Sequence, residues 1–348
     1  MKGVVKFKDG KDGWEIRDIE RRDPGPDEVE IKIAAAGICG SELHLFHDNH
    51  SYTPGTVIGH EYSGVISRVG SNIKDWKVGD RVITENHFGS CGKCFYCRTG
   101  NQALCKTRGG VGYHRNGGWA EYLCAPTRYM IRIPDSMSME EATVVEPLAI
   151  LTEALTVKEP VHAGETVLVQ GCGTIGLLAA QVAKAAGAGC VIITGMDQDE
   201  EVRLSIARKL PGIDHVVNIQ KQDLSALIAE LTDGEGVDVV VEASGSPAGI
   251  ASSIEAVRRL GRVLAIGEAP RAEIPFNWNR AVFKGITLKF NFGSNYLAWH
   301  RAVQMIESGK VDVKSLITHR IDMADFMEGF RLLDEKKAVK VVMKAFGA

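Results

Sequence analysis

The sequence predicts an α/β protein with two domains of different architecture. A chain of 348 residues is longer than one hydrophobic core usually supports, so two domains of roughly 150 residues are expected. Residues 1–148 contain short segments in which apolar and polar residues alternate, which is typical of half-buried strands. Residues 149–289 alternate apolar strands with helical stretches, as a doubly wound parallel sheet does.

Hydrophobic periodicity and turn residues assign the individual elements. The expected strands of the first domain cover 29–33, 64–69 and 79–83. Those of the second domain cover 166–170, 191–194, 237–241 and 262–266, and its expected helices cover 177–187, 201–210 and 250–259. The tail is expected to form helices over 298–308 and 323–337 and a strand over 339–343.

Charge and hydropathy argue against two classes of function. The net charge is -3 and no basic block is present, whereas nucleic-acid binding needs clustered positive charge. Residues 166–183 are uncharged over the length of a membrane span, but their glycines and polar residues indicate a buried strand that turns into a helix. Residues 1–22 are charged throughout, unlike a signal peptide. We therefore expect a cytoplasmic protein with neither a nucleic-acid nor a membrane partner.

Four of the 8 cysteines lie close together, namely Cys91, Cys94, Cys97 and Cys105. In a reducing compartment such a cluster favours metal thiolates over disulfides. Four thiolates can surround a tetrahedral Zn²⁺ with bonds of about 2.3 Å and leave no position open. The spacing predicts a structural zinc site that stabilises a loop. Free thiols in a flexible loop are the alternative, which four cysteines at this spacing disfavour.

A second set of possible metal ligands combines a thiolate, an imidazole and carboxylates. Cys39 follows the first strand, His60 and Glu61 stand side by side, and Glu146 precedes the second domain. Such mixed sets are typical of catalytic zinc, which keeps one position for water or substrate. Zinc of this kind lowers the pKa of a bound hydroxyl from about 16 towards 7, which prepares an alcohol to lose a hydride.

Two residues that follow Cys39 in the sequence have side chains that suit a proton relay. Ser41 and His44 could pass a proton from the buried site to solvent, because a histidine titrates near neutral pH. The alternative is structural: Ser41 caps a short helix that His44 merely decorates.

Residues 171–176 read Gly-Cys-Gly-Thr-Ile-Gly, a GxGxxG pattern. The pattern follows a predicted strand and opens a predicted helix, which is the context of a Rossmann dinucleotide site. Gly171, Gly173 and Gly176 would allow a tight turn and a close approach of the pyrophosphate, and Thr174 and Ile175 would begin the helix whose N-terminus attracts its charge. A glycine turn that only packs a helix on a strand is the alternative.

The loop after the second strand of this domain favours NAD over NADP. It carries Asp197 and three further carboxylates before the first basic residue, Arg203. Like charges repel the 2′-phosphate of NADP, whereas an acidic residue can hold the ribose hydroxyls of NAD. The residue at the strand end itself is Gly195, which leaves the assignment open.

Together these motifs resemble the zinc-containing medium-chain dehydrogenase/reductase superfamily, in its sorbitol dehydrogenase and threonine dehydrogenase branch. The resemblance covers essentially the whole chain. It is carried by the cysteine cluster, the GxGxxG stretch and the segments 37–41, 59–61, 117–122, 146–148, 242–245, 261–263 and 316–320.

The resemblance implies a GroES-like catalytic domain formed by residues 1–148 and 290–348, beside a Rossmann domain of residues 149–289. It also implies two zinc ions per chain. The catalytic one would be bound by Cys39, His60 and Glu61, with Glu146 as a fourth ligand or as a partner of the zinc-bound water. Ser41 and His44 match the relay positions of the family.

The implied reaction is reversible oxidation of a secondary alcohol to a ketone, with transfer of the hydride to NAD. Residues 291–296 replace the Arg-Tyr pair often found where polyol hydroxyls bind, and Trp119 and Glu153 are further departures. A sugar, polyol, cyclitol, amino alcohol or threonine therefore stays open as the small-molecule substrate. The second function class that we consider is a non-redox zinc lyase or nucleotide-binding protein. A homodimer or homotetramer is expected.

Overall fold

The computed structural model describes residues 1–270 and 273–347. Residues 271, 272 and 348, which fall inside the predicted domain ranges 149–289 and 290–348, lie outside the described residues. The chain divides into two compact units. The first contains Met1–Ala149, Ser294–Glu307 and Ile317–Ala348, and the second contains Ile150–Gly293 and Ser308–Leu316.

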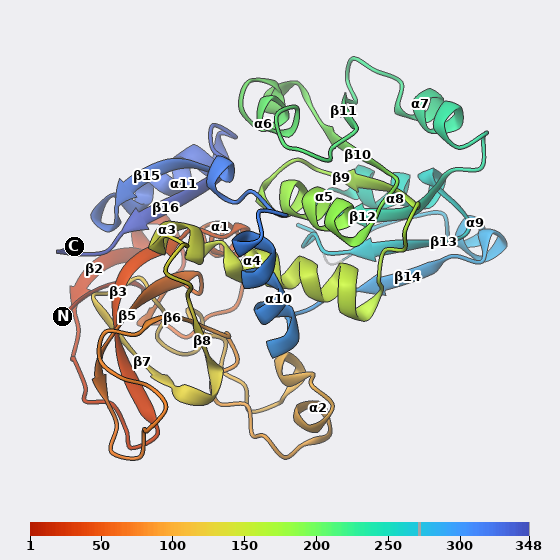
Figure 1. Cartoon of the computed structure of the whole chain (residues 1–348). Coiled ribbons are helices and arrows are strands. Elements are labelled where there is room, and N and C mark those ends of the chain that lie inside the picture. The colour runs from red at the N-terminus through yellow and green to blue at the C-terminus, as the bar shows by residue number, and fades with distance from the viewer. Residues whose placement is uncertain (271–272, 348) are drawn as a thin grey trace. The chain divides into compact units, whose positions relative to one another are not determined.

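The first unit is built on two sheets (Figure 1). The smaller has the strand order β2-β1-β4, and the larger has the order β15-β16-β3-β5-β6-β8, with β7 paired to β3. The strands are β1 (Lys2–Lys6), β2 (Trp14–Asp18), β3 (Glu28–Gly37), β4 (Thr56–Val57), β5 (Tyr62–Val69), β6 (Arg81–Thr84), β7 (Tyr122–Pro126), β8 (Met130–Arg132), β15 (Ile317–Asp322) and β16 (Lys340–Lys344). The helices are α1 (Gly40–Phe46), α2 (Phe95–Arg98), α3 (Met139–Thr143), α10 (Tyr296–Glu307) and α11 (Phe326–Asp334), and α4 (Val145–Thr152) crosses into the second unit.

Strand β3 is the centre of the larger sheet. Val29, Ile31 and Ile33 are buried at alternate positions, as the period of two predicts. The strand continues to Gly37, which lies opposite Val342 of β16. Figure 1 shows this contact between the red and the blue end of the chain. The end of the chain thus completes the sheet from which the loop with Cys39 emerges.

An aromatic cluster supports the two loops that lead to the predicted metal ligands. Trp119 is fully buried, packs among other buried rings of this unit, and donates from Nε1 to the carbonyl of Gly37 at 3.1 Å. Gly59, directly before His60, has φ +96, and a Cβ there would come within 2.0 Å of the Trp119 ring. Any other residue at position 59 would push this ring away and disturb the loop of His60.

The second unit is a six-stranded sheet in the order β11-β10-β9-β12-β13-β14, and every pair of neighbouring strands is parallel. Its strands are β9 (Thr166–Gln170), β10 (Cys190–Gly195), β11 (His215–Asn218), β12 (Val237–Glu242), β13 (Val257–Ala265) and β14 (Thr287–Phe290). Its α-helices are α5 (Thr174–Ala186), α6 (Ser205–Ala207), α7 (Leu224–Leu231), α8 (Pro247–Ala256) and α9 (Trp278–Lys284). The predicted α/β class with a doubly wound parallel sheet is confirmed.

Three of the predicted helices are wrong in extent. The helix expected over 323–337 is the α-helix Phe326–Asp334, preceded by the 3-10 turn Met323–Asp325. The helix expected over 250–259 ends at Ala256, because the β-branched Val257 begins β13 opposite Val237. The helix expected over 201–210 is a wider π-helical turn, Glu200–Leu204, followed by the short α6. The turn places Leu204 in the core against the strand-end Gly195.

The uncharged segment 166–183 is divided between β9 and the first part of α5, with a turn between them. Within residues 1–270 and 273–347, no helix combines the length and the apolar character that a membrane span requires.

Candidate functional site

The predicted ligands of the second metal set come together in the first unit. Cys39 caps the N-terminus of α1, His60 and Glu61 lie between β4 and β5, and Glu146 lies in the first turn of α4. Two overlapping donor sets are present, Cys39–Glu42–His60 and His60–Glu61–Glu146, and the donor atoms of each set lie within 4.8 Å of one another. His60 is the residue that the two sets share.

Glu42 is a member of this cluster that the sequence analysis missed. Its Oε1 lies 2.5 Å from His60 Nδ1, and its Oε2 accepts from the Cys39 amide at 2.7 Å. A carboxylate on Nδ1 fixes the imidazole and leaves Nε2 to face a metal ion. The feature of the sequence that could have identified Glu42 is its position, three residues after Cys39, the residue that caps α1.

The charges around His60 are tightly coupled. Burial raises the pKa of the Cys39 thiol, and the Glu61 carboxylate adds to this effect. Burial opposes the charged form of His60, but the charge of Glu42 and the contact with Cys39 outweigh it and raise the pKa of His60 well above its usual range. A divalent cation would reverse both effects, because metal ligands bind in their deprotonated forms.

Glu61 is fully buried, and its two carboxylate oxygens have different surroundings. Its Oε2 pairs with the ammonium of Lys340, which also donates to the carbonyl of Ile38 at 3.0 Å. Its Oε1 has no hydrogen-bond partner in the described part of the chain. A buried carboxylate oxygen without a partner is costly, and coordination of a cation would satisfy it. This donor set therefore fits zinc.

Glu146 is buried and is held by an amide. Asn86 Nδ2 donates to Glu146 Oε1 at 2.9 Å, and Glu146 Oε2 lies 4.0 Å from His60 Nε2. Burial raises the pKa of Glu146 to about 7. A cation bound by the neighbouring ligands would oppose this effect and favour the charged carboxylate.

The predicted relay residues have different surroundings. Ser41 Oγ accepts from the Tyr113 hydroxyl at 2.7 Å, and the same hydroxyl lies 3.3 Å from His60 Nδ1. The Tyr113 ring stacks on His50 with centroids 4.5 Å apart. His44 lies half-buried in the last turn of α1, and among the described residues no hydrogen bond joins it to Ser41. The structure thus connects Ser41 to Tyr113, which the sequence analysis missed.

The four cysteines of the predicted structural site also come together. Their sulfur atoms lie within 4.8 Å of one another, and Cys91 Sγ is 4.0 Å from Cys97 Sγ. A tetrahedral zinc site has sulfur–sulfur distances of about 3.8 Å. The thiol of Cys105 accepts from the Cys91 amide at 3.3 Å and contacts Thr107, and these contacts lower the pKa of Cys105 to about 5. All eight cysteines of the chain are free of disulfides. The cluster, which we call the cysteine lobe (residues 91–105), fits zinc.

The GxGxxG stretch forms the turn between β9 and α5 in the second unit. Gly171 has φ +97, which favours glycine, and a Cβ on Gly176 would come within 1.8 Å of the Gly171 carbonyl. A Cβ on Gly173 would meet no atom within 4 Å, so open space lies beside the residue that caps α5. Thr174 and Ile175 form the first turn of that helix. This arrangement fits a dinucleotide pyrophosphate at a helix N-terminus.

The acidic loop lies at the end of β10. The carboxylate of Asp197 accepts from Asn218 at 2.8 Å and lies 3.2 Å from the Lys221 ammonium, and these contacts lower the pKa of Asp197. Arg203 pairs with Asp199 at 3.2 Å. A Cβ on Gly195 would approach Cys172 Sγ to 2.6 Å. Packing therefore explains why the strand ends on glycine and not on an acidic residue.

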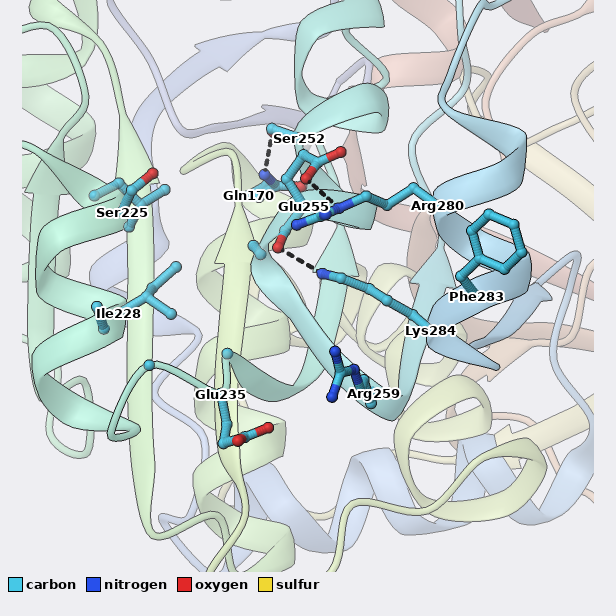
Figure 2. Close-up of a pocket in the computed structure, with 15 residues that line it drawn as sticks. Gln170, Ser225, Ile228, Glu235, Ser252, Glu255, Arg259, Arg280, Phe283 and Lys284 are labelled. Atoms are coloured by element: carbon cyan, nitrogen blue, oxygen red, sulfur yellow. Dashed lines mark hydrogen bonds and ion pairs between the residues drawn. The ribbon is translucent and has the colours of Figure 1, made fainter.

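The second unit also has a cavity of about 470 Å³ between α7, α8 and α9 (Figure 2). Lys284, which lines it, donates to the carbonyls of Ile254, Glu255 and Val257 at 2.6–2.9 Å and so closes the C-terminus of α8. Arg280 pairs with Glu255 at 2.7 Å. Lys284 and Arg280 therefore stabilise the fold. None of the predicted cofactor residues lines the cavity.

Glu85, at the end of β6, is a buried carboxyl whose Oε2 has no hydrogen-bond partner within the described ranges. Burial raises the pKa of Glu85 to about 8. The folded protein keeps this proton between about pH 4.5 and 8 while the unfolded chain loses it, so stability falls as pH rises through this range. Relative to Glu85→Gln, we expect the wild type to lose about 3–5 kcal/mol of unfolding free energy between pH 5 and 9. Urea unfolding of the wild type and of Glu85→Gln at pH 5 and pH 9 measures this loss. An equal pH dependence of the unfolding free energy in the two proteins would contradict the expectation.

Comparisons with known proteins agree on one family. The family description "Alcohol dehydrogenase GroES-like domain" matches residues 25–135, and "Zinc-binding dehydrogenase" matches residues 174–308. A sorbitol dehydrogenase of Halalkalibacterium halodurans is 34% identical over 343 residues, and an L-threonine 3-dehydrogenase of Escherichia fergusonii is 35% identical over 348 residues. Each alignment covers 99% of both chains. A solved Sinorhizobium meliloti protein, described as a zinc-binding dehydrogenase bound to NADP, has a TM-score of 0.89 and 28% identity. That match covers 99% of this chain and 98% of the other.

Proposed function

Because the chain belongs to the zinc-dependent medium-chain dehydrogenase superfamily, we propose that it oxidises the hydroxyl of a small secondary alcohol to a ketone and passes the hydride to NAD. The observation that carries the proposal is the buried donor cluster around His60, in which Glu61 Oε1 has no partner in the described part of the chain. A polyol, sugar, cyclitol or amino alcohol is the proposed class of substrate. L-threonine is the second candidate, since a threonine dehydrogenase is among the similar relatives.

We assign the binding of the catalytic zinc to Cys39, His60 and Glu61, with Glu146 beside them. When bound, zinc would supply Lewis-acid activation of the alcohol hydroxyl, and NAD would supply the hydride acceptor. Glu42 orients the imidazole of His60, and Lys340 holds one oxygen of Glu61 so that the other faces the donor cluster. These contacts leave the donor atoms little freedom to move, which favours binding of the metal ion in one geometry.

The proton released by the alcohol needs a path through the chain's own groups. The carboxylate of Glu146 lies 4.0 Å from His60 Nε2 and is placed to accept this proton. The Tyr113 hydroxyl donates to Ser41 Oγ and lies 3.3 Å from His60 Nδ1, so these groups form a second hydrogen-bonded path. We assign proton transfer to Glu146 and Ser41, and His44 stays a predicted outer member of the relay.

The cysteine lobe is proposed to hold the second, structural zinc, and the Gly171–Gly176 turn to hold the pyrophosphate of the dinucleotide. We propose that residues 1–148 and 290–348 form the catalytic domain and that residues 149–289 form the nucleotide-binding domain. The free thiols of all eight cysteines support the expectation of a cytoplasmic enzyme.

A homodimer or homotetramer is proposed from the edge of the parallel sheet. Strand β14 is last in the strand order, and neighbouring apolar side chains are highly exposed, among them Phe290 at 72% and Phe283 at 82%. An exposed strand edge with exposed apolar residues is a surface that a second copy of the chain could cover.

The preference for NAD is expected to depend on Asp197. Its replacement by asparagine should raise the ratio of kcat/KM with NADP to that with NAD by about fivefold, because two like charges 4 Å apart in water repel by about 1 kcal/mol. Steady-state kinetics with both cofactors measure the ratio. Glu201→Gln removes one exposed charge from the adjoining helical turn Glu200–Leu204 and should leave the ratio unchanged. An Asp197→Asn enzyme with the wild-type ratio would assign cofactor choice to other residues.

The proposed function is tested by a panel of polyols, cyclitols, sugars and β-hydroxy amino acids, run with NAD and NADP in parallel. Formation of the reduced cofactor with at least one alcohol is the expected result. Tight dinucleotide binding without any reduction across the panel would instead favour a non-redox zinc lyase or a nucleotide-binding protein of the same fold.

A further inference from the structure

Asn86 belongs to a buried polar segment that follows β6. Glu85, Asn86 and His87 are all buried, and the amide of Glu85 donates to the carbonyl of Tyr129 at 2.9 Å. The ring of His87 donates from Nε2 to the carbonyl of Ser294 at 2.6 Å. Because the residues on both sides of Asn86 are held by these bonds, its backbone is fixed inside the first unit.

The two polar atoms of the Asn86 side chain have different surroundings. Nδ2 donates to Glu146 Oε1 at 2.9 Å, whereas Oδ1 has no hydrogen-bond partner within residues 1–270 and 273–347. Burial of an amide whose carbonyl oxygen is unpaired costs free energy, and an apolar side chain would avoid that cost. The fold therefore gains little from an amide at this position, and its role lies in the bond to Glu146.

This bond determines which oxygen of Glu146 faces the donor cluster. Oε1 accepts from Asn86, and Oε2 lies 4.0 Å from His60 Nε2. Glu146 and His60 also belong to one donor set, whose atoms lie within 4.8 Å of one another. Two atoms bound to one tetrahedral zinc ion at about 2.1 Å are roughly 3.4 Å apart. A small movement of Oε2 would thus bring it to an ion at His60 while Oε1 stays bonded to Asn86.

We propose that Asn86 is a positioning residue of the catalytic zinc site, which holds Glu146 Oε1 and thereby presents Oε2 to the ion bound at His60. The inference rests on the proposed alcohol oxidation at a catalytic zinc and adds the residue that orients the acidic group beside it. Without the amide, the carboxylate is free to rotate. Residues that hydrogen-bond to the groups around a metal typically raise its affinity by about 10- to 100-fold.

The test measures zinc affinity of the full chain by competition with a chelator, with zinc per chain as the readout. The zinc ion that Cys39→Ala lacks is the catalytic one. Asn86→Leu and Asn86→Ala both remove the donor, and alanine cannot overfill the site if leucine prevents folding. We expect the catalytic ion to bind about 10- to 100-fold more weakly in both variants. The ion of the cysteine lobe should be retained, which shows that the chain is folded.

A double-mutant cycle shows whether Asn86 acts through Glu146. In a Glu146→Ala background the carboxylate is absent, so Asn86→Leu should change the affinity for the catalytic ion less than about twofold. A residue that only supports the fold would weaken zinc binding by the same factor in both backgrounds. That equal loss would overturn the inference.

Asn72→Leu is the matched control. Asn72 forms the same kind of bond, from Nδ2 to Asp27 Oδ1 at 2.9 Å, but it is exposed and its partner belongs to neither donor set. The control should hold both zinc ions as tightly as the wild type. If Asn86→Leu and Asn86→Ala also do so, the inference is wrong and the proposed oxidation stands. A wild type that binds only the lobe ion would contradict the catalytic zinc itself, and the inference with it.

Discussion

Replacement of Cys39 by alanine is expected to remove one of two zinc ions per chain and to lower kcat/KM for alcohol oxidation by at least about 10³-fold. The thiolate is one of the donors that meet at His60, and the remaining imidazole and carboxylates would bind zinc more weakly. The cysteine lobe would keep its own ion, because its four ligands are untouched. Zinc per chain and steady-state kinetics on the same preparation measure both effects.

Cys124→Ala is the control for this experiment. Cys124 is half-buried in β7 and belongs to neither donor set. The control should therefore bind two zinc ions and react at the wild-type rate. A Cys39→Ala protein that does the same would exclude Cys39 as a catalytic ligand.

Replacement of Cys94 by alanine is expected to act on stability. Zinc binding to four thiolates contributes on the order of 10 kcal/mol to the folding of small zinc domains, so loss of one ligand should cost several kcal/mol. Cys94 also donates its amide to Cys91 Sγ at 3.3 Å and caps the N-terminus of α2, so it has backbone contacts in the lobe as well as a predicted ligand atom. The midpoint of urea unfolding, followed with zinc content, measures the effect.

The two zinc sites are distinguished by which zinc ion a variant loses and by whether its stability falls. Cys94→Ala should lose its zinc and unfold at lower urea while the ligands at Cys39, His60 and Glu61 stay in place. Cys190→Ala, in the second unit and outside both donor sets, should change neither zinc content nor, by more than about 1 kcal/mol, stability. A Cys94→Ala protein with wild-type stability and two zinc ions would contradict a structural metal in the lobe.

Features that depend on local spacing could be predicted from the sequence. The cysteines of the lobe lie within a short segment, so one loop brings them together. The glycines of residues 171–176 are read from a strand, a turn and a helix in direct succession. The period of two at Val29, Ile31 and Ile33 of β3 matches the burial of these three side chains in the core.

Partners from distant parts of the chain could not be predicted. Lys340 pairs with Glu61 across a separation of 279 residues, and only the pairing of β16 with β3 brings them together. Tyr113 reaches Ser41 across 72 residues, from a loop without a regular pattern. Such contacts follow from tertiary packing, on which hydrophobic periodicity carries no information.

The central claim is that this chain oxidises an alcohol with zinc held at Cys39, His60 and Glu61. The most direct test removes zinc stepwise with a chelator and measures, on the same samples, zinc per chain and the rate of NADH formation with an alcohol identified in the panel. We expect activity to disappear as one zinc per chain is lost and to return when that zinc is restored. Alcohol oxidation at the full rate by protein free of zinc would contradict it.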